Sequence, residues 1–226
     1  MDNVPNVLSI LPSTLPNLQT VKLYFLLLHD IIEPAFPRCP RLQAVELHQY
    51  NELLLHEIDC AYVSELTLGT ELIPIAKGME VLCKFCNIRR LTVRPTDIII
   101  DPSFKPRTVL FPYLHSLELY GESAAELFRG LKMPTLKEVK FYQGLSLTLF
   151  EDASCAPNVE TVHVCLRQHN ATDRNFKKIK RLPTVVPLLR RLVVPRWWSY
   201  VEEESYGLSL EEDWGVQLEF WVDYWS

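Results

Sequence analysis

Two cysteines three positions apart, Cys83 and Cys86, have the spacing in this sequence that most directly suggests chemistry. Such a pair can ligate zinc or alternate between dithiol and disulfide, but a structural zinc site needs a second pair of ligands. The sequence has no second C-x-x-C, and none of its six histidines forms an H-x-x-x-H or H-E-x-x-H pair. We therefore expect no metal and interpret both cysteines as small buried hydrophobic residues. The alternative is a metal or redox site, and stoichiometric zinc in the purified protein would overturn the interpretation as buried hydrophobic residues.

Catalytic and nucleotide-binding motifs are missing from the rest of the sequence. It contains no G-x-S-x-G, no Walker loop and no dinucleotide-binding fingerprint. Its 7 glycines against 16 prolines argue against loops that cradle phosphate. We expect no cofactor and no enzymatic activity. An enzyme that uses the C-x-x-C pair, or a histidine and cysteine cluster on the sheet, is the less favoured alternative.

The composition is that of an intracellular globular chain. The 226 residues are 48% hydrophobic, carry a net charge of −5 and include six scattered cysteines, too few for a fold built on disulfides. The amino-terminal stretch has no basic region and is interrupted by Pro5, Pro12 and Pro16, unlike a signal peptide. No apolar run reaches the roughly 18 residues of a membrane span. We expect a cytoplasmic or nuclear protein, with neither a membrane nor a nucleic acid as its partner.

A short motif recurs along nearly the whole chain and predicts the elements that must position any site. A turn, usually with proline, precedes L-x-x-L-x-L or a β-branched equivalent, as in LPNLQTVKL at 15–23, FPYLHSLEL at 111–119 and MPTLKEVKF at 133–141. Eight copies are in phase, and a weaker ninth is VQLEFW at 216–221. The first apolar anchors of the eight copies are Leu18, Leu42, Val63, Ile88, Leu114, Leu136, Val159 and Leu189. They follow one another about every 24 residues, within the range of leucine-rich repeats.

The alternation after each anchor predicts a short strand with one apolar face. Val45 and Leu47 lie two positions apart, as do Leu117 and Leu119, so each pair shares one side of its strand. Strands separated by such long returns should run parallel, and stacked repeats bury a core that a single repeat cannot. We predict an α/β leucine-rich-repeat solenoid over 1–226, a single domain of about nine repeats. Its curved parallel sheet should have about 8–9 short strands, joined by helical or irregular return segments.

The return segments are predicted to be uneven. We expect helices over much of 71–86 and 170–182 and over 121–132. The stretch 50–58 should form one or two helical turns, whereas 94–108, with three prolines, should be an extended loop or a short strand. No linker or low-complexity break divides the chain.

The copies resemble the divergent leucine-rich repeats that follow the F-box in fungal F-box proteins. The resemblance covers about residues 8–221 and rests on the in-phase copies of L/F/C-P-x-L-x-x-L-x-L. It implies a module that recognises the substrate of an F-box-type ubiquitin ligase. The more regular repeats carry an asparagine or cysteine after each strand, and this sequence lacks it.

The F-box, a small helical bundle that docks a cullin-ligase adaptor, has no counterpart in this sequence, since the first repeat begins by residue 15. We therefore expect the adaptor as a partner only if an F-box lies upstream. A scaffold or decoy interaction protein without a ligase link is the alternative function.

Strand residues that point away from the core form a second pattern. Polar, charged and aromatic side chains alternate with the buried positions, so they share the exposed, concave side of the sheet, here called the open face. Tyrosine, tryptophan and arginine are the residue types that anchor protein interfaces. We therefore expect a protein partner on this face, against the alternative of a merely solvated sheet surface. The candidate binding residues are Tyr24, His48, Arg90, Arg94, Tyr120, Lys140, Tyr142, His163, Arg191 and Trp221.

Charged and aromatic residues are segregated near the carboxyl end. Residues 174–196 contain eight bases and no acid, whereas 199–226 contain eight acids and no base. We expect the two blocks to neutralise each other, and the alternative is a phosphate, nucleic-acid or nuclear-import patch. All five tryptophans lie in 197–226. We expect this segment to cap the open end of the solenoid, with a hydrophobic docking patch as the alternative.

Overall fold

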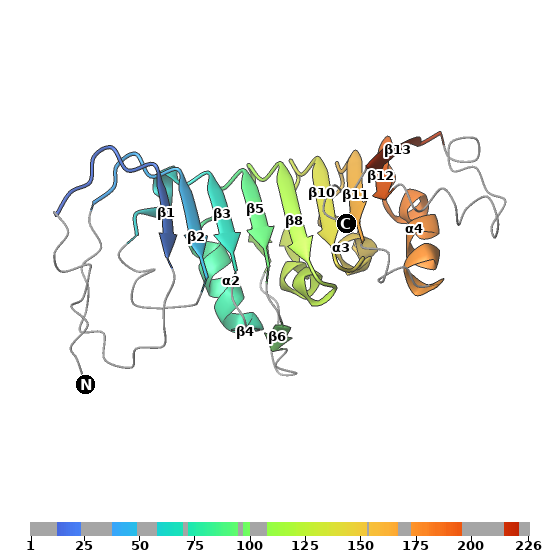
Figure 1. Cartoon of the computed structure of the whole chain (residues 1–226), viewed down its shortest axis with the longest axis horizontal. Helices are drawn as coiled ribbons and strands as arrows, with labels where there is room; N and C mark the ends of the chain where they lie inside the picture. The colour runs from blue at the N-terminus through green and yellow to red at the C-terminus, as the bar shows by residue number, and fades with distance from the viewer. Residues whose placement is uncertain are drawn as a thin grey trace.

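Nine short strands stand side by side in one sheet and follow the order of the sequence (Figure 1). The computed structural model describes residues 13–23, 38–48, 58–69, 72–94, 97–99, 108–152, 154–166, 173–195 and 215–221. The strands of the sheet are β1 (Thr20–Leu23), β2 (Ala44–Leu47), β3 (Glu65–Leu68), β5 (Arg90–Val93), β8 (Ser116–Tyr120), β10 (Glu138–Tyr142), β11 (Thr161–Cys165), β12 (Arg191–Pro195) and β13 (Gln217–Trp221). Each pairs in parallel with the next, which confirms the predicted solenoid-like α/β fold with a single parallel sheet.

The register of the sheet places equivalent residues of successive repeats directly beside one another. Val45 of β2 lies beside Leu66 of β3, which lies beside Leu91 of β5. The same holds further along, where Val162 of β11 pairs with Leu192 of β12. The regular spacing of anchors in the sequence is therefore a regular stack in space, with neighbouring strands about 4.8 Å apart.

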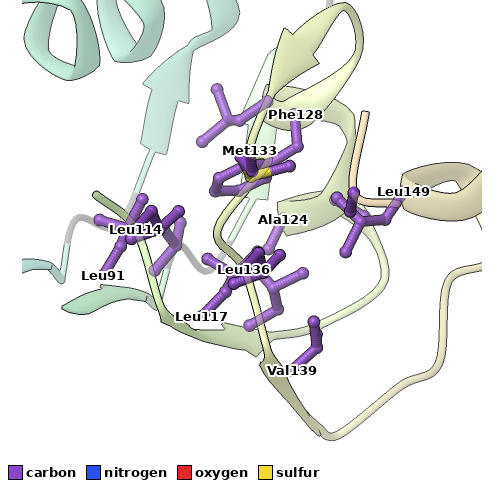
Figure 2. Close-up of a cluster of buried hydrophobic side chains, with 14 of the residues drawn as sticks. Leu91, Leu114, Leu117, Ala124, Phe128, Met133, Leu136, Val139 and Leu149 are labelled. Carbon is purple, nitrogen blue, oxygen red and sulfur yellow. The ribbon is translucent and has the colours of Figure 1, made fainter. Parts of the chain in front are cut away.

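The alternation along each strand separates a buried face from the open face. In β8 and β10 the second and fourth residues are fully buried, whereas the residues between them are partly exposed. Figure 2 shows the buried side, where Leu117 and Leu136 gather with Ala124 and Phe128. Each large aliphatic side chain buried in this way contributes about 1.5–3 kcal/mol before conformational entropy is subtracted. One cluster of buried residues runs continuously from the second repeat to the last.

The residues just before each strand link neighbouring repeats. The carbonyl of His115 accepts hydrogen bonds from the backbone N–H groups of both Lys137 and Glu138, and equivalent pairs recur along the sheet. Side chains add to this linkage, since Thr135 Oγ1 lies 3.0 Å from the carbonyl oxygen of Leu114 in the preceding repeat. These contacts satisfy backbone groups at the strand starts. The repeats are thereby joined without the asparagine or cysteine that more regular repeats carry after each strand.

Two predicted helical returns are present with shifted limits. α2 (Ile75–Lys84) lies within 71–86, and α4 (Asp173–Val185) begins and ends slightly later than 170–182. Each turns an apolar side to the core, as the fully buried Leu82 of α2 illustrates. Two further helical turns are η2 (Cys60–Tyr62) and α3 (Thr148–Glu151). Along the row of strands α2, α3 and α4 follow one another in sequence order (Figure 1).

Short strands outside the main sheet join some of the returns to one another. β4 (Leu72–Pro74) pairs in parallel with β6 (Asp97–Ile99), which agrees with the short strand expected within 94–108. β7 (Val109–Leu110) pairs in the same way with β9 (Leu131–Lys132). These pairs connect neighbouring repeats at a second level, away from the open face.

The return at 121–132 differs from the predicted helix. Only Ser123–Phe128 is helical, as the 3₁₀-helix η3, and the segment then ends in β9. Gly121 (φ 86°) and Gly130 (φ 77°) bracket η3 in the left-handed region, which glycine tolerates best. The helix predicted over 121–132 is therefore present only in part, as a 3₁₀-helix, because helical periodicity reveals neither these two turns nor the pairing of β9 with β7.

Several predictions fall on residues outside the described ranges. These are the turns at 50–58 except Ile58, the binding residue Tyr24, and the cap at 197–226 except 215–221. In that last range β13 pairs with β12 as the final strand of the sheet. The single-domain prediction stays a prediction. No helix in the described part of the chain is long and apolar enough to cross a membrane.

Candidate functional site

The open face consists of three rows of side chains that run across the strands. The first row contains Thr20, Ala44, Glu65, Arg90, Ser116, Glu138, Thr161, Arg191 and Gln217. The second row contains Lys22, Glu46, Thr67, Thr92, Glu118, Lys140, His163, Val193 and Glu219. The third row, at the carboxyl ends of the strands, contains His48, Gly69, Arg94, Tyr120, Tyr142 and Cys165.

The third row holds a planar stack, formed by Arg94, Tyr120 and Tyr142. The rings of Tyr120 and Tyr142 are parallel to within 10°, and their centroids are 4.3 Å apart. The guanidinium carbon of Arg94 lies 4.8 Å from the centroid of the Tyr120 ring. In-register parallel strands cause this arrangement, because they hold equivalent side chains about 4.8 Å apart, close to the separation of stacked rings. The three planar groups therefore restrict one another's rotamers on the open face.

Burial determines the protonation of the two tyrosines. It raises the pKa of Tyr120, and the opposing effect of the Arg94 charge does not outweigh it. Burial, together with the nearby carboxylate of Glu118, raises the pKa of Tyr142 strongly. Both phenols are therefore protonated at neutral pH, and each O–H can donate a hydrogen bond to a partner.

Charged side chains of the first two rows pair across neighbouring strands. Lys22 Nζ lies 2.7 Å from Glu46 Oε2, and the hydrogen bond from this lysine holds the pKa of Glu46 below its usual range. The further pairs are Lys140 with Glu118, Arg90 with Glu65, His163 with Glu138, and Arg191 with Glu219. Exposed pairs of this kind contribute about 1 kcal/mol or less each to stability. Their main effect is to orient the side chains and to offset the charges of the glutamates that face a lysine or an arginine.

Lys140 and His163 are the two half-buried basic residues among these pairs. Burial opposes the charge on Lys140, but its hydrogen bond to Glu118 and the charges of Glu118 and Glu138 outweigh burial and raise the pKa of the lysine. His163 Nε2 lies 2.8 Å from Glu138 Oε1 without the alignment of a good hydrogen bond. Burial outweighs the attraction of this carboxylate and lowers the pKa of His163. The imidazole is therefore mainly neutral at pH 7.

Gly69 is a third-row residue that sequence reasoning missed. A Cβ atom at this position would lie 3.0 Å from Nδ1 of His48, so the imidazole of His48 lies over the place that a side chain would occupy. The other ring nitrogen, Nε2, is 2.7 Å from Glu46 Oε1. The signal in the sequence is a glycine directly after a strand, at a position where the neighbouring repeats carry the large residues His48 and Arg94.

The predicted binding residues fall into two contact groups and several separate pairs. The planar stack is the first group. Lys140 and His163 form the second, since both approach the carboxylate of Glu138. Residues paired separately with a glutamate are His48, Arg90 and Arg191. Tyr24 and the side chain of Trp221 lie outside the described part of the chain, although the backbone of Trp221 belongs to β13.

The C-x-x-C pair is placed differently from the expectation. Cys83 is exposed on α2 and Cys86 is half-exposed in the turn that follows, so the prediction that both are buried is wrong. The helix turns Val81 and Leu82 to the core instead. All six cysteines are described and none is in a disulfide. Among the described residues no three His, Cys, Asp or Glu side chains gather as a metal site.

Cys60 is the cysteine with the most strongly shifted acidity. Burial raises the pKa of its thiol to about 11. Its Sγ donates to the carbonyl of Ile58 at 3.3 Å. Because the thiolate is the reactive form, this environment disfavours Cys60 as a nucleophile.

The basic block meets acids from two parts of the chain. Arg191 pairs with Glu219, one residue from each of the two charged blocks, as the neutralisation hypothesis expects. Arg174 and Lys178 of α4 pair instead with Glu122, which precedes η3. Most acids of the carboxyl-terminal block lie outside the described residues. The two blocks thus neutralise each other at Arg191. The bases Arg174 and Lys178 of α4 pair instead with Glu122, which lies outside the acidic block.

Comparisons with known proteins identify no family for this chain. No family model and no curated protein matches the sequence. A solved structure with similarity is that of a Bacteroides fragilis protein, a target of the Northeast Structural Genomics Consortium, with a TM-score of 0.43 and 11% sequence identity. The similarity covers 81% of this chain and 66% of the Bacteroides chain.

Proposed function

We propose that this chain is a non-catalytic interaction module that binds a protein partner through its open face. The observation that carries the proposal is the planar stack, in which Arg94, Tyr120 and Tyr142 lie in contact on an accessible part of the sheet. Arginine and tyrosine are enriched among the residues that dominate binding energy in protein interfaces. Their stacking supports a binding role, because side chains that are already ordered lose less entropy when a partner binds.

The distribution of charge is compatible with the same role. Four of the five glutamates of the first two rows pair with a lysine or arginine of a neighbouring strand, and Glu138 lies beside His163 and Lys140. A partner would therefore meet few isolated charges there. A merely solvated sheet surface remains the competing interpretation. It predicts that removing the stacked side chains leaves every interaction of the protein unchanged.

Within this class, we propose the more specific function of substrate recognition in an F-box-type ubiquitin ligase. Support for it comes from the resemblance of the in-phase repeats alone. A scaffold or decoy without a ligase link is the alternative. Affinity purification of the natural full-length protein distinguishes them: a ligase subunit recovers a cullin and its adaptor, whereas a scaffold recovers partners without either.

The protein-binding proposal is tested by capture with matched variants. Tagged wild-type chain, Tyr142→Ala and Arg181→Ala are expressed in the source cells, and the proteins that co-purify are quantified by mass spectrometry. Arg181 is exposed on α4, away from the open face, so it serves as the control. We expect at least one protein to be recovered with wild type and Arg181→Ala but depleted with Tyr142→Ala. Identical recoveries from all three would contradict the proposal.

A further inference from the structure

Arg94 differs from the other lysines and arginines of the described open face. Each of the others lies beside a glutamate of a neighbouring strand, and the five glutamates of the first two rows all have such a basic neighbour. No carboxylate among the described residues pairs with Arg94, which is exposed and has its guanidinium over the ring of Tyr120. The third row contains no acidic residue at all. The planar stack therefore presents one positive charge whose partner is not supplied by the described part of the chain.

We infer that the planar stack recognises an acidic residue of an extended protein segment, with Arg94 binding the carboxylate and the two tyrosines packing against the residues next to it. The inference rests on the proposed function, since it specifies the chemistry of the partner that the open face would bind. The partner segment should therefore carry a carboxylate that reaches Arg94, with apolar or aromatic residues beside it that contact the two tyrosines.

The geometry of Arg94 supports carboxylate recognition. A guanidinium carries five N–H donors in one plane. Tyr120 accepts a hydrogen bond from Arg94, and the donors that remain can form two parallel hydrogen bonds with a carboxylate. Contact with Tyr120 fixes that plane before binding, which reduces the entropy lost on association. Arg90 lies four residues earlier, at the start of β5 and on the same face. Its Nη1 lies 3.3 Å from Glu65 Oε1, so the charge of Arg90 already has a partner.

The size of the stack fits an extended segment. From Arg94 to Tyr142 the stack crosses two strand spacings, or about 10 Å. An extended chain covers this distance in about three residues, at about 3.4 Å each. If an acidic residue of the bound segment contacts Arg94, the residue two or three positions away in that segment would therefore lie over Tyr120 and Tyr142. The phenol O–H groups of these tyrosines can donate hydrogen bonds to the backbone of the segment.

A phosphate group would use the same hydrogen-bond donors, but the surroundings favour a carboxylate. Phosphorylated side chains carry close to two negative charges and are usually bound by clusters of basic residues. Here the nearest third-row base, His48, lies with Nε2 2.7 Å from Glu46. Among the described third-row residues, a dianion at Arg94 would thus meet a single arginine rather than a cluster of bases.

A positional peptide library tests the inference on the purified full chain. The library consists of ten-residue peptides in which each position is varied in turn among acidic, amide, basic, apolar and phosphoserine residues, and binding is read by fluorescence polarisation. We expect one position to prefer Asp or Glu over Asn or Gln by about tenfold. Arg94→Ala should abolish that preference, Arg94→Lys should retain part of it, and Arg181→Ala, on α4 away from the open face, should leave it intact.

Four results would overturn the inference. They are no enrichment of any peptide, a preference for neutral residues, an acidic preference that survives Arg94→Ala, and a stronger preference for phosphoserine than for Glu. Binding without an acidic preference, if it is lost in Tyr142→Ala, would refute the inference and leave the proposed protein-binding function standing. The co-purification experiment with Tyr142→Ala tests the proposed protein-binding function independently of this inference.

Discussion

The phenol rings of Tyr120 and Tyr142 stack 4.3 Å apart on adjacent strands of the open face, β8 and β10. The contact arises because the two tyrosines occupy the same position in consecutive repeats, which the parallel register then places side by side. Arg94, at the equivalent position one strand earlier, extends the pair to three planar groups. The repeat thus creates a surface feature that no single repeat contains.

Replacing Tyr120 by alanine should lower the free energy of unfolding by about 1 kcal/mol, because aromatic pairs contribute about 0.5–1.5 kcal/mol beyond buried area. Tyr120→Phe keeps the ring and should keep most of the stability. Urea denaturation followed by circular dichroism measures both variants. Equal midpoints for the alanine and phenylalanine variants would mean that the stack contributes nothing to stability.

Replacing Leu136 by alanine should destabilise the protein by about 2–5 kcal/mol, since its side chain is fully buried and a cavity would remain. Leu18→Ala is the matched control, because Leu18 is the same anchor in the first described repeat and is only partly buried. Its cost should be clearly smaller in the same urea titration. A loss at Leu18 as large as that at Leu136 would contradict the order of burial described above.

Much of the sheet could be predicted from sequence, because its determinants are local. An anchor such as Leu114 and the alternation of Leu117 and Leu119 recur at nearly constant spacing, so nine parallel strands follow from pattern alone. The return at 121–132 could not be predicted in the same way. Its form depends on two glycines with positive φ and on the pairing of β9 with β7.

The candidate site was predictable as a set of residues but not as a set of contacts. Alternation assigns Arg94, Tyr120 and Tyr142 to one face, yet their stacking depends on the register between repeats of unequal length. The same dependence hid Gly69, whose importance comes from a histidine on the neighbouring strand. The exposure of Cys83 was missed because the C-x-x-C spacing does not reveal which side of α2 faces the core.

Gly69→Ala should displace the imidazole of His48, because the new Cβ would lie 3.0 Å from Nδ1. The backbone of Gly69 does not require glycine, so crowding alone should cause the effect, with a loss of about 1 kcal/mol in the free energy of unfolding. The control is a double-mutant cycle with His48→Ala, which removes the ring. Additive effects in the cycle would show that the two residues do not interact.

Acidification should weaken the fold in two stages. Burial holds the pKa of His163 below its usual 6.5, so below that pH the unfolded chain binds the proton more readily than the folded protein. The stability is therefore full above about pH 6.5 and falls as the pH drops below it. Glu46, with its pKa lowered from 4.5, adds a second loss below about pH 4.5.

The measurement for this prediction is urea denaturation at pH 7.5, 6.5, 5.5 and 4.0. The charged groups that face His163 are Glu138, Lys140, Arg191 and Glu219, and they remain in the control variant His163→Gln. We expect this variant to lose the fall between pH 6.5 and 5.5 and to keep the loss at pH 4.0. The same pH profile for wild type and variant would exclude His163 as the cause of the first stage.

The central claim, that the open face contacts a protein, is tested most directly by site-specific photo-crosslinking in the source cells. A benzophenone amino acid is placed at Thr92, in the second row on β5, and in a separate protein at Arg181, exposed on α4. We predict a discrete cross-linked protein from position 92, lost when Tyr142→Ala is added, and none from position 181. Cross-links from position 181 alone, or from neither position, would contradict the claim.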